Sequence, residues 1–160
     1  MKSARTLLTT LGAILLTFVA LIAALVVSRS SVDAKTNDWV GSWNTEVLIP
    51  NLNVMFPALM TFNSDGNLIA DETPSPLETS GHGAWIKTGG NEGAYTFYYL
   101  VGDAADPAKW TRGKVSGSIK LSPQADKWSG PFKIIVLDQN GNTTFSADGK
   151  MSATRINVEH

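Results

Sequence analysis

The sequence predicts an all-β fold, an eight-stranded up-and-down antiparallel barrel that follows an N-terminal transmembrane or signal helix. Three observations predict it. Apolar and polar side chains alternate with a period of two in most segments after residue 38, as they do in half-buried strands. Turn signals such as Asp65-Gly66 and Asn140-Gly141 separate these segments. Eight such segments fit within residues 38–160, and closing them into a barrel removes the unpaired sheet edges. A two-sheet sandwich uses similar signals and stays open as the alternative.

The N-terminal residues predict an export or anchoring segment. Lys2 and Arg5 form a short basic start, and residues 7–27 then contain no charged side chain. This run is longer than the apolar region of most signal peptides and long enough to span a membrane. We therefore expect either an uncleaved signal anchor or a cleaved signal peptide, with residues 32–34 (Val-Asp-Ala) as the cleavage signal.

The chain accordingly divides into three parts. Residues 1–28 form the signal peptide or signal-anchor helix, residues 29–37 a polar linker, and residues 38–160 the barrel domain. Basic residues precede the apolar run, so the N-terminus should stay in the cytoplasm. The barrel domain is then extracytoplasmic, in the periplasm or at the cell surface, and either anchored in the membrane or secreted.

The first strand, residues 38–49, organises the rest of the barrel. Trp39 and Trp43 share one of its faces with Thr45 and Val47, because side chains alternate along a strand. Two tryptophans on one face are a large apolar surface that requires burial. This face should therefore point into the barrel.

The remaining strands are read from alternation and from the turns between them. Residues 63–67 and 138–142 contain the Asp-Gly and Asn-Gly pairs of tight hairpins. Pro74 and Pro76 exclude regular pairing in the long loop of residues 73–83. The expected strands cover residues 38–49, 54–63, 68–71, 84–87, 94–101, 110–121, 128–137 and 143–158.

Composition excludes several function classes. The chain has no Cys, so disulfides, thiolate metal sites and a Cys nucleophile are excluded. The formal net charge of −1 gives no basic field for nucleic acid. His82 is the only histidine before the C-terminal residue, which argues against a zinc site. We expect no metal and no cofactor.

Small residues at inward positions predict space inside the barrel. An eight-stranded barrel is just wide enough to hold one small ligand. Small side chains on the inward faces of the sixth and eighth expected strands would enlarge that space. They are Gly113, Gly117, Ala147, Gly149 and Ala153.

Residues 41–43, Gly-Ser-Trp on the first strand, and Arg155 on the last carry a family resemblance. They resemble the pattern of lipocalins and fatty-acid-binding proteins, which make up the calycin group. In those families the tryptophan packs under an arginine from the last strand. The resemblance implies that Trp43 and Arg155 close one end of the barrel, and the ligand would then enter at the other end.

A second resemblance covers most of the domain. The chain is similar to a group of small bacterial barrel proteins with a calycin-like fold, and this similarity implies no particular activity. The matching motifs are Thr-Phe-Asn-Ser-Asp-Gly at residues 61–66, Ser-Gly-His-Gly-Ala-Trp at 80–85, Leu-Asp-Gln-Asn-Gly-Asn at 137–142 and Thr-Arg-Ile at 154–156.

His82 is the candidate for chemistry. It stands between Gly81 and Gly83 at an expected loop-to-strand junction, where its imidazole could act as an acid or base near neutral pH. In the alternative interpretation, the two glycines serve a sharp turn. Four carboxylates lie near the expected mouth, where they could pair with His82 or with one another: Glu46, Asp71, Glu72 and Glu78.

The sequence favours a binding protein over an enzyme. The hypothesis is a monomeric, lipocalin-like barrel that is tethered to a membrane by its N-terminal helix and binds a small hydrophobic molecule. One alternative is a small barrel enzyme, an isomerase, cyclase or hydrolase, that uses His82 at the mouth. Another is an envelope interaction domain without a ligand. The expected ligand-binding residues are Phe56, Met60, His82, Trp85, Tyr95, Phe97 and Tyr99.

Overall fold

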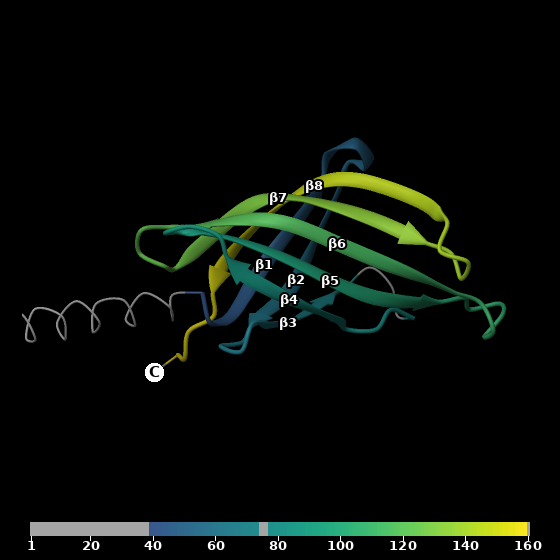
Figure 1. Ribbon diagram of the computed structural model, residues 1–160, viewed down its shortest axis with the longest axis horizontal. Helices are drawn as coiled ribbons and strands as arrows, with labels where there is room; N and C mark the ends of the chain where they lie inside the picture. Colours follow the sequence, from purple (N-terminus) through teal and green to yellow (C-terminus); the bar gives the residue numbers. More distant parts are fainter. Residues whose placement is uncertain (1–38, 74–76, 160) are drawn as a thin grey trace, which may run out of the picture. The chain divides into compact units, whose positions relative to one another are not determined.

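The computed structural model describes residues 39–73 and 77–159, which form eight antiparallel strands and one short 3-10 helix (Figure 1). The predicted N-terminal helix, the linker and the start of the barrel domain at residue 38 lie outside the described residues. The elements are β1 (Gly41–Ile49), η1 (Pro50–Leu52), β2 (Val54–Phe62), β3 (Asn67–Glu72), β4 (Gly81–Lys87), β5 (Glu92–Gly102), β6 (Trp110–Leu121), β7 (Lys127–Leu137) and β8 (Thr143–Arg155).

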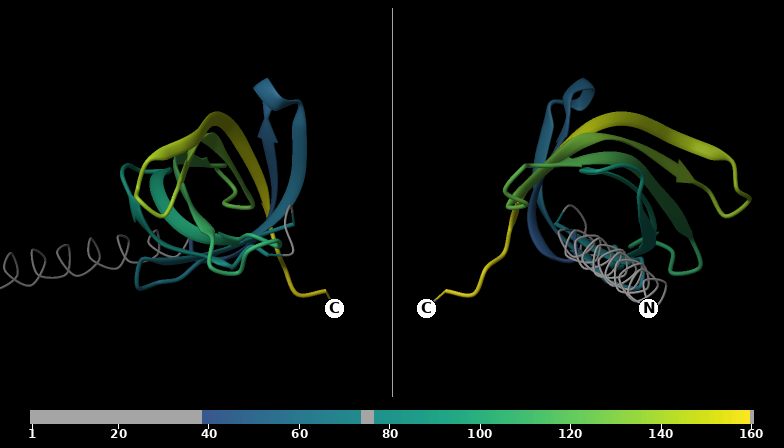
Figure 2. Two further views of the ribbon diagram at one scale, coloured as in Figure 1. Left: turned by 90° about the vertical axis from the view of Figure 1, so that its right-hand side faces the viewer. Right: turned by 60° about the vertical axis from the view of Figure 1, so that its left-hand side comes forward.

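The strands close into one barrel in sequence order (Figure 2). Each strand pairs with its neighbours in the chain, and β1 also pairs with β8 between Trp43↔Arg155 and Leu48↔Lys150. This closure confirms the eight-stranded up-and-down barrel and excludes the two-sheet sandwich. A closed ring of strands leaves no open edge along the paired residues.

The two predicted hairpin turns are confirmed. Gly66 has a φ of +87° and Gly141 a φ of +85°, a conformation that glycine adopts without a steric cost. Asp65 accepts a hydrogen bond from the amide of Asn67, and Asp138 accepts one from the amide of Asn142. The Asp side chains therefore fix both turns, as the sequence suggested.

The barrel has a closed end and an open end. We call closed the end where Trp39, Trp43 and Arg155 lie. The Arg155 guanidinium carbon stands 4.2 Å from the centre of the Trp43 ring. Arg155 also donates to the backbone oxygens of Val40 and Ala125, both at 2.9 Å. One side chain therefore ties the start of β1, the β6–β7 turn and the end of β8 together, and the cation–π contact contributes about 0.5–2 kcal/mol.

Tryptophan rings fill this closed end. Trp39 and Trp43 are fully buried, and the Trp43 indole donates to the backbone oxygen of Trp39 at 3.3 Å. Trp43 meets Trp128 edge-on with ring centres 6.3 Å apart, and Trp85 packs against Trp39 at 6.4 Å. The end opposite these rings is the one we call open.

Aromatic rings occupy the space that inward glycines leave, which corrects the prediction of free volume inside the barrel. Tyr99 lies over Gly113 and Tyr95 over Gly117, directly across the β5–β6 pair, so a Cβ atom on either glycine would meet the ring. Phe132 covers Gly149 in the same way. The three inward glycines of β6 and β8 are thus partners of large rings on neighbouring strands, an arrangement that packs a sheet face tightly.

Several strand boundaries differ from the prediction by one to three residues, and two of these differences are informative. Strand β4 begins at Gly81 and not at Ala84, so His82 lies within a strand and not at a loop junction. The reason is that both glycines are inward positions, Gly81 beneath the Phe97 ring and Gly83 against the backbone of Thr96 and Phe97. Because glycine has no side chain, the sequence shows no apolar–polar alternation at these positions. Strand β8 ends at Arg155, three residues earlier than expected, where Arg155 is fixed by its contacts at the closed end.

Candidate binding site at the open end of the barrel

Two glutamates and Tyr99 meet on the inner side of the open end, and Tyr95 lies deeper in the barrel. Glu72 is the last residue of β3 and is in phase with the buried Leu68 and Ala70, so its side chain faces inward. Glu78 forms a backbone bridge with Val101 of β5 and faces the same side. Tyr95 and Tyr99 point inward from β5. The four side chains interact electrostatically and come from β3, the loop after it and β5.

Burial controls the protonation of both glutamates. Desolvation raises the pKa of Glu72 to about 7, and the nearby charge of Glu78 adds to the shift. Desolvation alone raises the pKa of Glu78 to about 7. The ionised form of Glu78 therefore makes ionisation of Glu72 less favourable. Near neutral pH this pair can therefore gain or lose a proton easily.

The tyrosines stay protonated, so each keeps a hydroxyl hydrogen that can be donated. Burial, followed by the charge of Glu72, raises the pKa of Tyr95 above its usual range. Burial and the charges of Glu78 and Glu72 do the same to the pKa of Tyr99. The Tyr95 hydroxyl donates to the sulfur of Met151 at 3.1 Å. A thioether is a weak acceptor, so this phenol is held by packing more than by hydrogen bonding.

Neither glutamate has a cationic partner within the part of the chain that the structure describes. The ion pairs found there join Lys109 to Asp106 in the β5–β6 loop and Lys120 to Glu92, and all four side chains are exposed. A half-buried carboxylate without a partner lowers the stability of the fold. Groups of this kind are typical of functional sites, where the cost is offset by binding or chemistry.

Apolar side chains also line the open end. Phe56, Val101, Ile134 and Ala147 face inward at the open end and pack on the core, yet each keeps part of its surface in solvent. Strands β5 to β8 have 11 to 13 residues and β1 to β4 only 6 to 9, so the long strands carry inner surface past the ends of the short ones. The open end therefore combines exposed apolar surface with two acidic groups.

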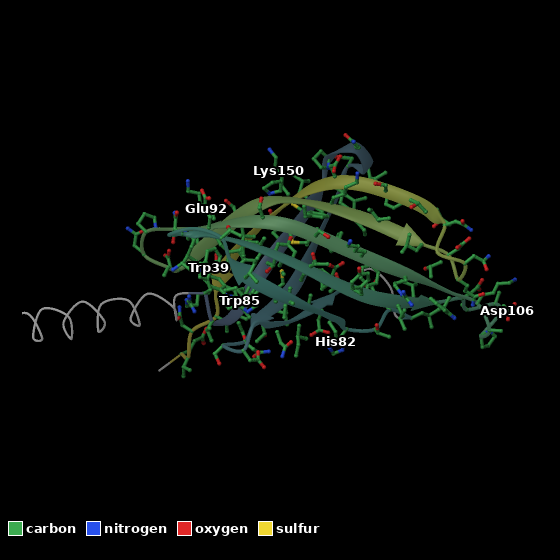
Figure 3. The ribbon with its side chains drawn as sticks, viewed as in Figure 1. Trp39, His82, Trp85, Glu92, Asp106 and Lys150 are labelled. Carbon is green, nitrogen blue, oxygen red and sulfur yellow. The ribbon has the colours of Figure 1, made fainter. Side chains whose placement is uncertain are left out.

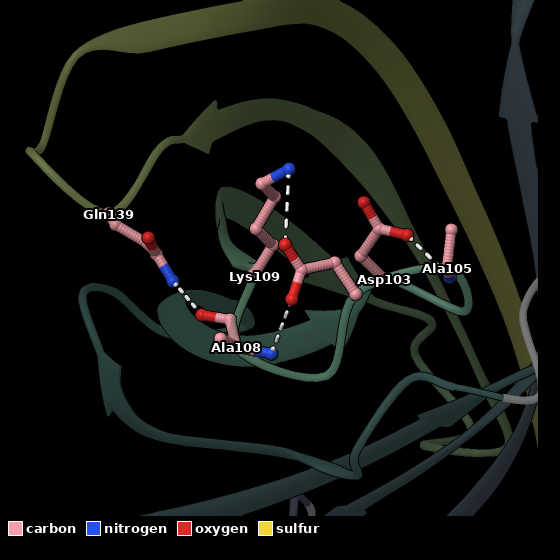
Figure 4. Close-up of polar contacts among 6 residues, drawn as sticks. Asp103, Ala105, Ala108, Lys109 and Gln139 are labelled. Atoms are coloured by element: carbon pink, nitrogen blue, oxygen red, sulfur yellow. Dashed lines mark hydrogen bonds and ion pairs between the residues drawn. The ribbon is translucent and has the colours of Figure 1, made fainter.

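Polar contacts hold the rim of this end in place (Figure 4). In the β5–β6 loop, Asp103 accepts a hydrogen bond from the amide of Ala105 at 2.8 Å. The Gln139 side chain, in the β7–β8 turn, donates to the backbone oxygen of Ala108 at 2.7 Å. The two loops thus form one connected rim, and a hollow of about 570 Å³ lies between them.

The structure separates the predicted ligand-binding residues into groups. Phe56 and Tyr99 lie at the open end with the glutamates. Met60, Tyr95 and Phe97 are buried in the packed middle of the barrel. Trp85 lies near the closed end, where its indole donates to the backbone oxygen of Asn63. These positions leave only part of the predicted set within reach of a ligand at the open end.

His82 points away from the barrel (Figure 3). It is exposed on the outer face of β4, between Ile69 of β3 and Tyr98 of β5. The enzyme alternative required an inward imidazole with a hydrogen-bonded partner. This geometry therefore does not support the alternative in that form.

The sequence alone did not distinguish Glu72 and Glu78 from Glu46 and Asp71 as candidate site residues. The last two are exposed, whereas Glu72 and Glu78 are inward. The inward direction of Glu72 could have been predicted, because this residue continues the inward alternation of Leu68 and Ala70. For Glu78 no local pattern exists, since its position depends on a single bridge to β5.

A larger hollow of about 920 Å³ is lined by residues of both faces of the sheet. Outward side chains such as Glu46, Met55, Lys120 and Ser152 contribute to it, and so do inward ones such as Phe56 and Trp128. The hollow does not include Glu72 or Glu78 in its lining.

Comparisons with known proteins do not assign the chain to a family. No protein-family model matches it, and no curated protein matches it either. In residues 39–73 and 77–159, no helix is long and apolar enough to cross a membrane. The same residues contain no group of three or more His, Asp or Glu side chains placed to hold a metal ion.

Proposed function

We propose that this protein is an exported, membrane-tethered barrel that binds a small molecule at its open end. The ligand has an apolar body and a positively charged or hydrogen-bond-donating group. Export and tethering rest on the basic start and the uncharged run of residues 7–27. The calycin-like closure at Trp43 and Arg155 is consistent with a ligand that enters from the opposite end.

The observation that carries the proposal is the pair of half-buried carboxylates, Glu72 and Glu78. Their raised pKa values mean that ionising them in the folded protein costs free energy, and a bound cation would offset that cost. A binding site with a few polar groups in an apolar surround is the usual form of a small-molecule site. The carboxylates would orient the ligand, and the apolar side chains would supply contact area.

The packed interior limits how far a ligand can enter. Tyr95, Phe97 and Tyr99 form a row of rings on the inner face of β5, with centres 6.1 and 6.5 Å apart. This row is the floor of the proposed site. A ligand would therefore lie above Tyr99, against Phe56 and Ile134, and not deep in the barrel as in the original hypothesis.

Two probes of equal length test the proposal. Octylammonium carries a positive charge, and octanol is its neutral counterpart. At pH 8 both glutamates are mostly ionised, and octylammonium should bind at least about tenfold more tightly than octanol, a difference of about 1.4 kcal/mol. As the pH falls through about 7 to 5.5 the carboxylates take up protons, so this preference should disappear. Calorimetric or NMR titration measures both affinities.

Matched variants locate the binding. The double substitution Glu72→Gln and Glu78→Gln should remove the preference for the cation and leave octanol affinity within about threefold. Glu46→Gln, on the exposed outer face, should change neither affinity. Equal affinity of the two probes for the unaltered protein at pH 8 would contradict the proposal.

A second candidate function rests on the same carboxylates. A pKa near 7 suits a general acid or base at neutral pH, and Tyr99 supplies a neighbouring hydrogen-bond donor. The protein would then catalyse a proton transfer on the molecule it binds. A bound molecule whose mass changes on incubation with the protein, and not with the double variant, distinguishes this function from binding alone.

A further inference from the structure

We infer that the tip of the β1–β2 hairpin, residues 48–55, is a second membrane contact that enters the lipid headgroup region. This inference goes beyond ligand binding. It rests on the proposed tether only because the tether would keep the barrel near a membrane. We refer to residues 48–55 as the hairpin tip. Its surface, its charge and its position on the barrel each support the inference.

The hairpin tip exposes apolar side chains. Leu48 is 38% exposed, Leu52 49%, Val54 41% and Met55 64%. No charged side chain occurs between Glu46 and Asp65. Single exposed apolar residues are ordinary on a protein surface, but a contiguous group of them marks a contact site.

The tip projects because the neighbouring strand ends early. Pairing of β2 with β3 stops at Ala58↔Glu72, whereas pairing of β1 with β2 continues to Ile49↔Val54. The hairpin therefore extends away from the barrel wall, as two views of the fold show (Figures 1 and 2). Pro57 pairs with Glu46 of β1 and has no amide hydrogen to donate, which suits a strand segment that lacks a partner on its β3 side.

The tip is preformed. Asn53 adopts a left-handed conformation with φ +51° and donates its amide to the backbone oxygen of Pro50 at 3.0 Å. This bond satisfies a backbone group that a lipid environment would leave without a partner. Asn51 and Asn53 keep polar side chains at the tip, so the contact should be shallow, at the depth of the headgroups.

Charge and chain length favour a lipid surface as the partner. Lys150 of β8 lies directly across from Leu48, so a basic group flanks the apolar tip (Figure 3). Anionic headgroups attract such a group. The linker of residues 29–37 spans at most about 30 Å when extended, so a tether at residues 7–27 would keep the barrel close to the membrane.

The absence of cysteine from the sequence makes a direct test possible. Leu52→Cys on the full chain takes a single environment-sensitive fluorophore, and the labelled protein is reconstituted into phosphatidylcholine vesicles with or without phosphatidylserine. The matched control is Asn140→Cys, in the exposed β7–β8 turn at the same barrel end. We expect a blue-shifted emission at position 52 and at least about fivefold stronger quenching by brominated lipid than at position 140. Phosphatidylserine should enhance both effects, and Lys150→Glu should abolish that enhancement.

Other outcomes would overturn the inference. Equal, water-like emission at positions 52 and 140 while the chain sediments with the vesicles would show that the tether holds but the tip makes no contact. If the chain stays in the aqueous fraction, both the proposed tether and the membrane contact of the hairpin tip are wrong. Ligand binding could still be measured separately. A blue shift without vesicles that grows with protein concentration would identify a second copy of the chain as the partner instead.

Discussion

Replacing Gly83 by alanine is expected to destabilise the fold by about 3 kcal/mol or more. A Cβ atom at this position would overlap the backbone oxygen of Thr96 and the backbone of Phe97 on the neighbouring strand. Backbone atoms of a paired strand cannot move aside as the end of a flexible side chain can. Chemical denaturation of the unaltered and substituted proteins measures the difference in the free energy of unfolding.

Two controls isolate the cause. His82→Ala changes the adjacent residue, but that side chain is exposed on the outer face, so the free energy of unfolding should change by less than about 0.5 kcal/mol. Gly90→Ala adds a methyl group where no atom lies within 4 Å and should be equally mild. A large effect at His82 together with a small one at Gly83 would reverse our interpretation of the Gly-His-Gly segment.

Replacing Trp43 by alanine is expected to destabilise the fold by about 3–5 kcal/mol. The indole is fully buried, and it lies under Arg155 and edge-on to Trp128. Its removal leaves a cavity and deprives the Arg155 guanidinium of the ring that it covers. Thermal or chemical unfolding monitored by circular dichroism measures the loss.

Trp110→Ala is the matched control, since it removes the same side chain from the opposite end of the barrel. Trp110 is 36% exposed, and its recorded ring contact is with Arg112 at 5.6 Å. The expected cost is below about 1 kcal/mol. Similar losses for the two tryptophans would contradict a role of Trp43 in closing the barrel.

The barrel was predictable because its signals are local. Asp65-Gly66 and Asn140-Gly141 specify tight turns through their own backbone preferences. Alternation then assigns each side chain to a face, and the inward tryptophans of the first strand indicate which face is buried. Strand order followed from the short connections between neighbours.

The content of the interior was not predictable in the same way. The sequence shows that Gly113 and Gly117 face inward, but not whether they leave a void or make room for a ring. That depends on register, which places Tyr99 opposite Gly113 and Tyr95 opposite Gly117. A one-residue slip between the strands would have moved both rings to the outer face.

The environment of the candidate site could not be predicted from local sequence patterns either. Glu72 could have been assigned to the interior by alternation, but its environment depends on Glu78, which reaches the barrel from an irregular loop. His82 was predicted as a candidate for chemistry because it is a lone histidine between two glycines. Its actual direction follows from the inward positions of Gly81 and Gly83, which only the folded β4–β5 pair reveals.

Native mass spectrometry of the full chain, isolated from its own cells, tests the central claim most directly. We predict a bound molecule of a few hundred daltons on the unaltered protein and on Glu46→Gln, and its loss from the Glu72→Gln, Glu78→Gln double variant. The same molecule retained equally by all three proteins would contradict binding at the open end, and bare protein in every preparation would contradict the proposed function itself.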